Sequence, residues 1–236
     1  KLGKRDGAKS VSEYRADGIL PEAMLNFLAQ LGWNDGTEQD IFTKEELIEK
    51  FSLDRVQKSG ARFDEQRLLW LNGQWIRRIS LDDLFNRVKD FWGESAQNAN
   101  EEYKKEVLGL VFDRLKTLKG LPLASDYFFA EQNPDLEMIS KNKQLKKLEK
   151  SQLLDLLGKS IDKFEKVEDW NDDELQESLN QLLEETGQKP GILFQIIRIS
   201  LTWAPFSPAL NQTLRVIGKN ESIKRLKNSF REIEKM

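Results

Sequence analysis

The sequence predicts an all-α protein, and three observations support this fold class. Apolar residues recur at helical spacing along most of the chain. Residues that typically begin and end helices bracket these apolar stretches. Stretches that alternate apolar and polar residues, as half-buried strands do, are short and few. We therefore expect a chain built from helical units.

The first long helix is predicted to begin at Pro21 and to end before Gly32. Proline is tolerated in the first turn of a helix, and glycine commonly follows the last turn. We expect Trp33 to fold back onto this helix. The apolar residues within it recur with helical spacing: Met24, Leu25, Leu28 and Leu31.

Three further helix starts are marked by capping residues. Thr43 with Glu46 three residues later has the pattern of a capping box, in which each side chain bonds the backbone of the other. Ser80 begins a weaker version of the same pattern. Asn171 is a typical N-cap for the helix that is expected to end at Gly187.

Near the C-terminus, Ser207 and Pro208 predict an N-cap followed by a first-turn proline. Gly218 is expected to end that helix before a last one that runs through Arg231. Two stretches are candidates for strands, namely Lys9 to Ser12 and Gly191 to Ile199. The apolar density of the second stretch fits a buried helix equally well.

The composition excludes several kinds of chemistry. The 236-residue chain has neither histidine nor cysteine. It therefore has no Ser-His-Asp or Cys-His nucleophile pair, no disulfide and none of the usual zinc ligands, and we expect no metal site. Lysine, arginine, carboxylates, hydroxyls and aromatics remain, and they suit contacts to phosphate and nucleic acid. The lack of cysteine fits a cytoplasmic protein.

Charge is distributed unevenly along the chain. The net charge is −3, so no general basic field attracts nucleic acid, and any RNA binding has to be local. Acidic residues gather in VEDWNDDELQESLNQLLEETG, whereas KNKQLKKLEK and ESIKRLKNSFREIEK lean basic. No apolar run approaches the roughly 18 residues of a membrane helix.

The order of several motifs resembles one family over essentially the whole chain. The chain opens with KLGKRDGA, followed by Tyr14, GILPEAMLNFLAQLGW and EELIEKFSLDRVQKSGARFDEQRLLWLNGQWIRR. It closes with IRISLTWAPFSP and ALNQTLRVIGKNESIKRLKNSF. This series resembles bacterial glutamyl-tRNA synthetases from their KMSKS-type loop to their C-terminus. The loop's third position, usually serine in this family, is Gly3 here.

The resemblance implies a stem-contact unit over residues 1–79 and two helical anticodon-binding units over 80–136 and 137–236. It implies an enzyme that uses ATP, with Mg²⁺, to attach glutamate to tRNA-Glu and releases AMP. Lys4 would be the main ATP contact and Lys1 would support it, because ammonium groups stabilise charge that develops on the phosphates. The nucleotide-binding half lies upstream of this loop in the family. We therefore expect the isolated chain to be inactive, and to be a monomer.

The resemblance also implies the residues that contact the tRNA. Arg67 would offer a charged fork to phosphate, and Trp70 would offer a flat face to a sugar or base. Arg114 would read the third anticodon base. A guanidinium donates to the acceptor edge of cytosine and matches guanine poorly, so Arg114 implies a form that accepts tRNA-Glu and rejects tRNA-Gln.

The first two anticodon bases would be contacted from one helix end. The residues implied there are Arg198, Ser207, Pro208 and Leu210. Asn211 stands where the family often carries an aromatic residue, so we expect Trp203 or Phe206 to supply any stacking contact.

Each motif also has a structural interpretation. KLGKR alone is typical of a solvated terminus, and Arg114 could simply form a surface ion pair. Most apolar residues of RFDEQRLLWLNGQWIRR are expected to pack in a core: Phe63, Leu68, Leu71 and Trp75. The alternative for the whole chain is a non-catalytic helical module that binds RNA or protein. A glutaminyl-tRNA synthetase shares the loop, but its anticodon module is built of β-barrels, which this sequence does not predict.

Overall fold

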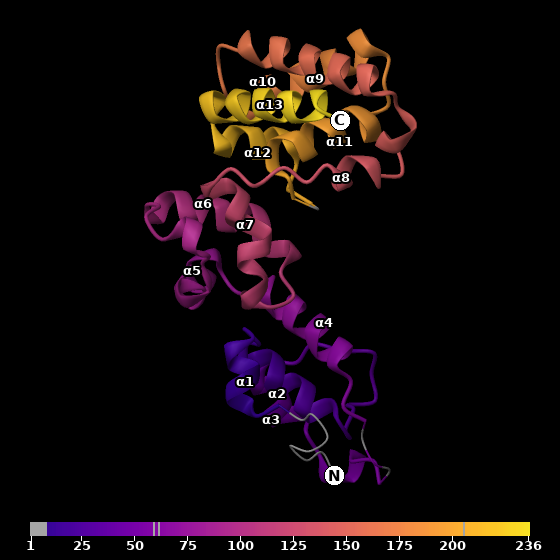
Figure 1. Cartoon of the computed structure of the whole chain (residues 1–236). Helices are drawn as coiled ribbons and strands as arrows, with labels where there is room; N and C mark the ends of the chain where they lie inside the picture. The colour runs from indigo at the N-terminus through magenta and orange to yellow at the C-terminus, as the bar shows by residue number, and fades with distance from the viewer. Residues whose placement is uncertain (1–8, 59, 61, 205) are drawn as a thin grey trace. The chain divides into compact units, whose positions relative to one another are not determined.

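The computed structural model describes residues 9–58, 60, 62–204 and 206–236, and these residues are helical with no β-strand (Figure 1). An isolated antiparallel bridge joins Trp33 and Val56. The all-α expectation is confirmed. Among the residues described, no helix is both long and apolar enough to cross a membrane.

The chain falls into two compact units. The N-terminal unit comprises the residues up to Gln97 together with Val111–Leu123, and the C-terminal unit comprises Asn98–Leu110 and Ala124–Met236. This division does not decide between two and three domains, so the three expected domains stay a prediction.

The helices of the N-terminal unit are short. The α-helices are α1 (Val11–Ala16), α2 (Pro21–Gln30), α3 (Lys44–Lys50), α4 (Glu65–Ile76) and α5 (Leu81–Arg87). Single 3-10 turns complete the unit: η2 (Leu53–Arg55), η3 (Lys89–Phe91), η4 (Glu94–Ala96), η5 (Phe112–Arg114) and η6 (Leu118–Gly120).

Helix α2 packs against α4 and α3. Phe27, Leu68 and Leu71 form the core between α2 and α4, and Phe63 packs against it. The predicted packing of Phe63, Leu68 and Leu71 is confirmed, and Phe27 is an addition. The helix predicted from Pro21 is confirmed, but two of the apolar residues whose spacing marked it, Leu25 and Leu28, are exposed. The packing against α4 instead buries the side of α2 that carries Ala23, Asn26 and Phe27. Trp33 is buried with a second small cluster that includes Phe42 and Leu47.

The C-terminal unit contains the longer helices. They are α8 (Glu137–Ser140), η7 (Leu145–Lys147), α9 (Lys150–Glu165), α10 (Asp172–Thr186), α11 (Pro190–Thr202), α12 (Leu210–Ile217) and α13 (Lys219–Glu234). Helices α6 (Glu101–Val111) and α7 (Leu121–Phe129) contribute most of their residues to this unit. Helix α13 packs against α9, α11 and α12, and α10 packs against α9 and α12 (Figure 1). One apolar core joins these helices.

Several predicted helix ends are confirmed. The capping box of Thr43 and Glu46 is present, Ser80 accepts a hydrogen bond from the Asp83 backbone, and Asn171 caps α10. Gly187 ends α10 in the left-handed conformation with φ of 62°.

Both strand candidates were wrong. Ser10 and Glu13 form a capping box that starts α1, so the candidate that begins at Lys9 leads directly into a helix. The stretch from Gly191 to Ile199 lies inside α11. The alternative interpretation of this stretch as a buried helix is therefore the correct one. The last helix extends beyond Arg231 to Glu234.

Candidate nucleic-acid interface

Arg67 and Trp70 lie on one face of α4, near its start. Asp64 caps the helix by accepting hydrogen bonds from the backbone N–H groups of Gln66 and Arg67. Because residues three apart share a helix face, the Arg67 guanidinium lies over the Trp70 ring, 4.5 Å from its centroid. Trp70 keeps 39% of its surface exposed, which is unusual for tryptophan in a helical core. The structure therefore brings together the two residues expected to approach the tRNA stem.

Asp40 holds the Arg67 side chain in place. Its carboxylate accepts a charge-assisted hydrogen bond from Nη2 of Arg67, and both side chains are partly exposed. The guanidinium is therefore fixed between a carboxylate and an aromatic face. Nothing in the sequence around Asp40 marked it as the partner of Arg67, because the two residues meet only through the fold.

Arg114 is the last residue of η5, and its side chain is exposed. The backbone on either side of it is held by residues of α4 and its end. Arg77 Nη1 donates to the Asp113 carbonyl at 2.8 Å, and Asn72 Nδ2 donates to the Lys116 carbonyl at 2.7 Å. These two hydrogen bonds fix the turn that presents Arg114.

Asn72 is a fully buried polar side chain with partners on two segments. Its Oδ1 accepts from the Leu20 backbone N–H at 2.7 Å, and its Nδ2 also donates to the Gly18 carbonyl at 3.2 Å. Gly18 has φ of +79° and accepts a hydrogen bond from the Leu118 N–H. Asn72 thus ties the α1–α2 turn to the segment that follows Arg114. The sequence analysis missed this role, since nothing distinguishes Asn72 from a solvent-facing asparagine.

The two candidate contacts of the N-terminal unit lie at opposite ends of α4. Arg67 is in the first turn of the helix, whereas the hydrogen bonds to the Arg114 turn come from Asn72 and Arg77. At about 1.5 Å of rise per residue, Arg67 and Arg77 are separated by roughly 15 Å along the helix axis. The structure therefore keeps the Arg67–Trp70 pair separate from Arg114.

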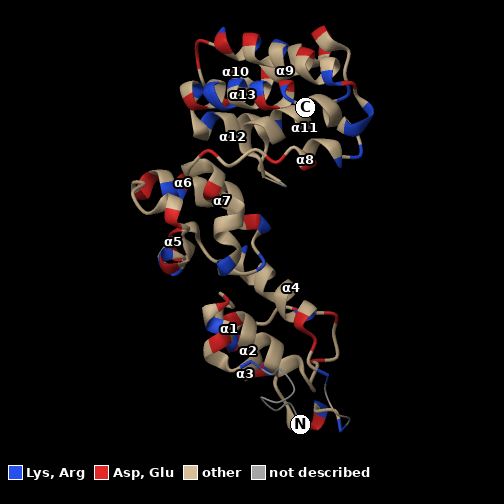
Figure 2. Ribbon diagram, viewed as in Figure 1, with Lys and Arg blue, Asp and Glu red and all other residues tan. Residues whose placement is uncertain are grey.

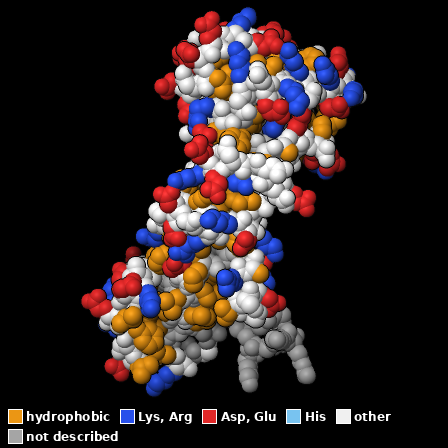
Figure 3. Space-filling model, turned by 90° about the vertical axis from the view of Figure 1, so that its left-hand side faces the viewer, with side chains coloured by type: hydrophobic (Ala, Val, Ile, Leu, Met, Phe, Trp, Pro, Cys, Tyr) orange, Lys and Arg blue, Asp and Glu red, His pale blue; other side chains and the backbone are white. Residues whose placement is uncertain are grey.

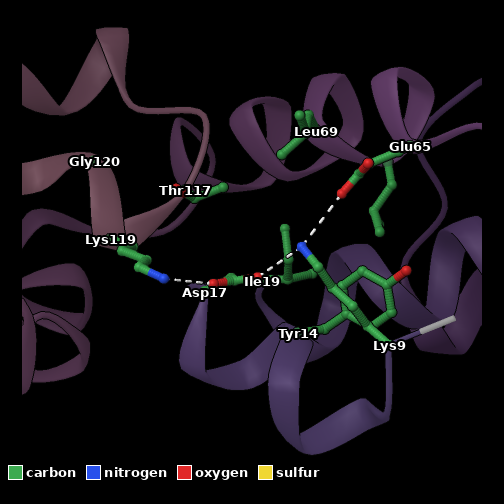
Figure 4. Close-up of a pocket in the computed structure, with 10 residues that line it drawn as sticks. Lys9, Tyr14, Asp17, Ile19, Glu65, Leu69, Thr117, Lys119 and Gly120 are labelled. Atoms are coloured by element: carbon green, nitrogen blue, oxygen red, sulfur yellow. Dashed lines mark hydrogen bonds and ion pairs between the residues drawn. The ribbon is translucent and has the colours of Figure 1, made fainter. Parts of the chain in front are cut away.

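A cavity of about 320 Å³ lies beside this turn in the N-terminal unit. Lys9 donates to Asp17 at 2.9 Å and to Glu65 at 3.4 Å, and Lys119 donates to Asp17 at 2.8 Å (Figure 4). The hydrogen bond from Lys119, followed by that from Lys9, holds the pKa of the Asp17 carboxyl below its usual range. These ion pairs compensate the charges of the side chains that line the cavity. Through Asp17 they connect Lys9 to Lys119, in the segment that follows Arg114.

In the C-terminal unit, Arg198 and Ser207 are in direct contact. Arg198 Nε donates to Ser207 Oγ at 2.9 Å, and Nη1 lies 3.5 Å from Gln195 Oε1. Ser207 is buried, with 3% of its surface exposed. The structure thus joins two of the residues expected to contact the anticodon.

The predicted helix start at Ser207 was wrong. Helix α12 begins at Leu210, its N-cap is Ala209, and no side chain caps it. The Ser207 hydroxyl is engaged instead by Arg198 and by the Pro208 carbonyl. A contact with a residue nine positions away has overridden the local capping signal.

The exposed aromatic residue beside this contact is Phe206. It keeps 42% of its surface exposed, whereas Pro208 and Leu210 are buried. Trp203 is also buried, and its Nε1 donates to Ser229 Oγ at 2.9 Å. Of the two residues expected to stack on a base, only Phe206 therefore presents a free ring face.

Comparisons with known proteins cover both units. Residues 83–230 match the anticodon binding domain family, and residues 1–70 match the catalytic domain family of class I tRNA synthetases (E and Q). A glutamate–tRNA ligase of Caldanaerobacter subterraneus is 33% identical over 99% of the chain and 48% of its own length. That of Carboxydothermus hydrogenoformans is 36% identical over 98% of the chain and 48% of its own length. The chain belongs to the anticodon binding domain family, and over nearly its whole length it is similar to about half of these glutamate–tRNA ligases.

Solved structures of the synthetase family have the same fold. A glutamate–tRNA ligase of Elizabethkingia meningosepticum, determined in complex with its amino acid, superposes with a TM-score of 0.81 at 25% identity. It matches 99% of this chain and 49% of its own chain. The glutamate–tRNA synthetase of Elizabethkingia anophelis gives a TM-score of 0.79 at 26% identity over 98% of this chain and 48% of its own. The chain therefore spans about half the length of the synthetases it matches.

Two expected site residues, Lys1 and Lys4, lie outside the described residues. Both fall in the stretch that matches the synthetase catalytic domain. Within the part of the chain that the structure describes, no group of three or more acidic, histidine or cysteine residues could hold a metal ion.

Proposed function

We propose that this chain is the tRNA-binding portion of a glutamate–tRNA ligase that recognises tRNA-Glu through its anticodon and inner stem. The observation that carries the proposal is the anticodon-binding match over residues 83–230, which contains Arg114, Arg198 and Ser207. The exposure of Arg114 and the contact between Arg198 and Ser207 support it.

Arg114 reads the third anticodon base. Its turn is held from both sides by backbone hydrogen bonds, so its guanidinium is presented from a fixed point. The guanidinium donates to the acceptor edge of cytosine and meets donor groups on guanine. Arg114 therefore selects tRNA-Glu over tRNA-Gln, and the parent enzyme is of the discriminating type.

The other two contacts have separate tasks. The Arg67–Trp70 pair provides a charge and a flat ring for the backbone and sugars of the inner stem. The end of α11 and the segment before α12 contact the first two anticodon bases through Arg198, Ser207, Pro208 and Leu210. Phe206, the exposed ring next to them, stacks on a base.

In the full-length enzyme, Lys1 and Lys4 contact ATP. Glutamate attacks the α-phosphate, glutamyl-AMP forms and pyrophosphate leaves. The terminal adenosine of the tRNA then takes the glutamyl group from glutamyl-AMP, and AMP leaves. Ammonium groups stabilise the negative charge that builds on the phosphates during the first step. Mg²⁺ accompanies the nucleotide.

The surface of the N-terminal unit supports its role as part of a catalytic domain. Hydrophobic side chains gather on one of its faces (Figure 3), and large exposed patches of this kind mark contacts with other protein surfaces. The exposed apolar residues of α2, α3 and the segment that follows α3 all lie within the catalytic-domain match: Leu25, Leu28, Ile48, Phe51, Leu53 and Val56. We further propose that the full-length enzyme is cytoplasmic and monomeric, with domain limits at residues 79 and 136.

The test is binding of the chain to tRNA-Glu and to tRNA-Gln transcripts, before and after the substitution Arg114→Gln. The parent is expected to prefer tRNA-Glu. One well-made arginine–base contact gives about 1–3 kcal/mol of discrimination, so the substitution should reduce the preference by about tenfold. Filter binding measures both dissociation constants.

Arg15→Gln is the matched control, because Arg15 is an exposed arginine of α1 in the same unit. It should leave the preference unchanged. An Arg114→Gln protein that rejects tRNA-Gln as strongly as the parent does would show that Arg114 has another role.

A further inference from the structure

A lysine-rich segment of the C-terminal unit lies outside the residues assigned so far. Residues 141–150, here called the lysine segment, contain five lysines and one glutamate. They connect α8 to α9, and Figure 2 shows the ribbon of this connection coloured blue at several positions. All five lysines are exposed. The segment is therefore a concentrated positive charge in a chain whose net charge is −3.

Three of these lysines have uncompensated charges. Lys141 forms an ion pair with Glu137, and Lys150 donates to the Glu234 carbonyl at 3.1 Å. Within the described part of the chain, the ammonium groups of the other three form no ion pair or hydrogen bond. They are Lys143, Lys146 and Lys147.

The backbone that carries these three lysines is well anchored. Asn142 Oδ1 accepts hydrogen bonds from the backbone N–H groups of Gln144 and Leu145, at 2.9 and 3.1 Å. The Leu145 side chain is completely buried in the core of the unit. The ammonium groups therefore project from a fixed turn, so a partner need not order the backbone when it binds.

The lysine segment packs directly on the helix that carries Arg198. The η7 turn and α8 both contact α11, and a Cβ at Gly191 would lie 2.6 Å from the Gln144 side chain. Glycine at this position thus permits the close approach. Gly191 and Arg198 are seven residues apart on α11, or roughly 10 Å along the helix axis. A polynucleotide held at Arg198 can therefore continue to the lysine segment.

The charge distribution of the unit favours this side of the molecule for an anion. Residues 168–186, which include α10, contain eight acidic residues and no lysine or arginine. This acidic stretch repels a phosphate backbone, and the lysine segment attracts it. Within this unit, a polyanion is therefore expected to lie along the lysine segment and away from the acidic stretch.

We propose that the lysine segment is a phosphate-binding surface, in which Lys143, Lys146 and Lys147 contact the backbone of the RNA whose bases Arg198 and Ser207 approach. This inference rests on the proposed tRNA-binding function. The lysine segment would add a contact that increases the affinity for RNA without distinguishing its base sequence, because ammonium groups bind phosphate as point charges.

The salt dependence of tRNA binding tests the proposal. In the triple variant Lys143→Gln, Lys146→Gln and Lys147→Gln, each lost phosphate contact should lower the slope of log K against log salt by about 0.7–1, so by about 2–3 in total. The loss of affinity should be greatest at low salt. It should be equal for tRNA-Glu and for a transcript with an altered anticodon.

The control is a second triple variant, Lys159→Gln, Lys163→Gln and Lys166→Gln, at the other end of α9. It changes the net charge by the same amount and should leave the slope within error of the parent. Melting curves should show that both variants remain folded, since five of the six lysines are exposed and an ion pair such as that of Lys163 with Glu185 contributes little to stability.

The outcomes separate this inference from the function on which it rests. If the parent distinguishes anticodons but the first triple variant keeps the parental slope, the lysine segment does not bind RNA, and an acidic protein partner becomes the better explanation. If the slope falls but the parent does not distinguish anticodons, the phosphate surface stands and the anticodon assignment fails. If the parent does not bind tRNA, both are overturned.

Discussion

Asn72 is the residue on which the geometry of the N-terminal unit most depends. It lies in α4 with no exposed surface, and it hydrogen-bonds the backbone of Gly18, Leu20 and Lys116. A buried amide with three satisfied hydrogen bonds stabilises a fold and also fixes which segments meet. Here it fixes the segment that follows Arg114.

We predict that Asn72→Ala lowers the free energy of unfolding by about 2–4 kcal/mol. The substitution leaves the Leu20 N–H and the Lys116 carbonyl without their side-chain partner. The Gly18 carbonyl keeps the hydrogen bond from the Leu118 N–H. Each group that loses its partner costs about 1–3 kcal/mol before the site relaxes. Urea unfolding followed by tryptophan fluorescence measures the change.

Asn180→Ala is the control for Asn72, because Asn180 is exposed on α10 and alanine is a good helix former. It should change the free energy of unfolding by less than about 0.5 kcal/mol. An Asn72→Ala protein as stable as this control would show that the buried network adds nothing to stability.

Single residues also show where reasoning from sequence succeeds and where it fails. Arg67 and Trp70 are three apart on a helix, so their contact follows from local geometry. The role of Arg114 comes from the resemblance of motifs and stays a prediction. Asp40 and Asn72 were not predictable, since their partners lie far away in sequence. Only the folded chain brings such groups together.

At the scale of elements, the turn between α1 and α2 is the most tightly constrained. Gly18 has a positive φ, and a Cβ at this position would lie 2.5 Å from the Leu118 backbone nitrogen. Gly187, at the end of α10, has φ of +62°, but a Cβ added there would have no atom within 4 Å outside its own neighbours. A substitution at Gly187 therefore adds backbone strain alone, whereas a substitution at Gly18 adds backbone strain and a steric clash.

We predict that Gly187→Ala costs about 1–2 kcal/mol, which is the strain of a left-handed residue with a Cβ. Gly18→Ala should cost roughly 3 kcal/mol or more, since it adds a clash with backbone that cannot move aside without breaking the Leu118 to Gly18 hydrogen bond. Urea unfolding of the two variants gives the comparison. Equal costs would mean that the turn and the Leu118 segment separate easily.

Helix starts were predicted correctly where the capping residue and its partner lie close together in the sequence. The capping box of Thr43 and the N-cap of Asn171 were predicted because both partners lie within one helical turn. The Ser10 capping box has the same form, but the sequence analysis missed it and made Lys9 to Ser12 a strand candidate. The predicted N-cap at Ser207 was wrong because a distant residue, Arg198, donates a hydrogen bond to its hydroxyl.

At the scale of the whole molecule, the candidate RNA contacts are shared between the two units. The N-terminal unit carries Arg67, Trp70 and Arg114, and the C-terminal unit carries Arg198 and the lysine segment. The chain has a net negative charge, so we expect RNA affinity to depend on these local groups and not on a general attraction. We expect a chain that engages one tRNA through both sets of contacts to bind it more tightly than either unit alone.

Anticodon recognition is the central claim, and one binding measurement tests it most directly. The dissociation constant of the parent chain is measured for a tRNA-Glu transcript and for the same transcript with the third anticodon base changed from cytosine to guanine. The account predicts that the altered transcript binds about tenfold more weakly, because the Arg114 guanidinium then faces donor groups. Equal dissociation constants for the two transcripts would contradict it.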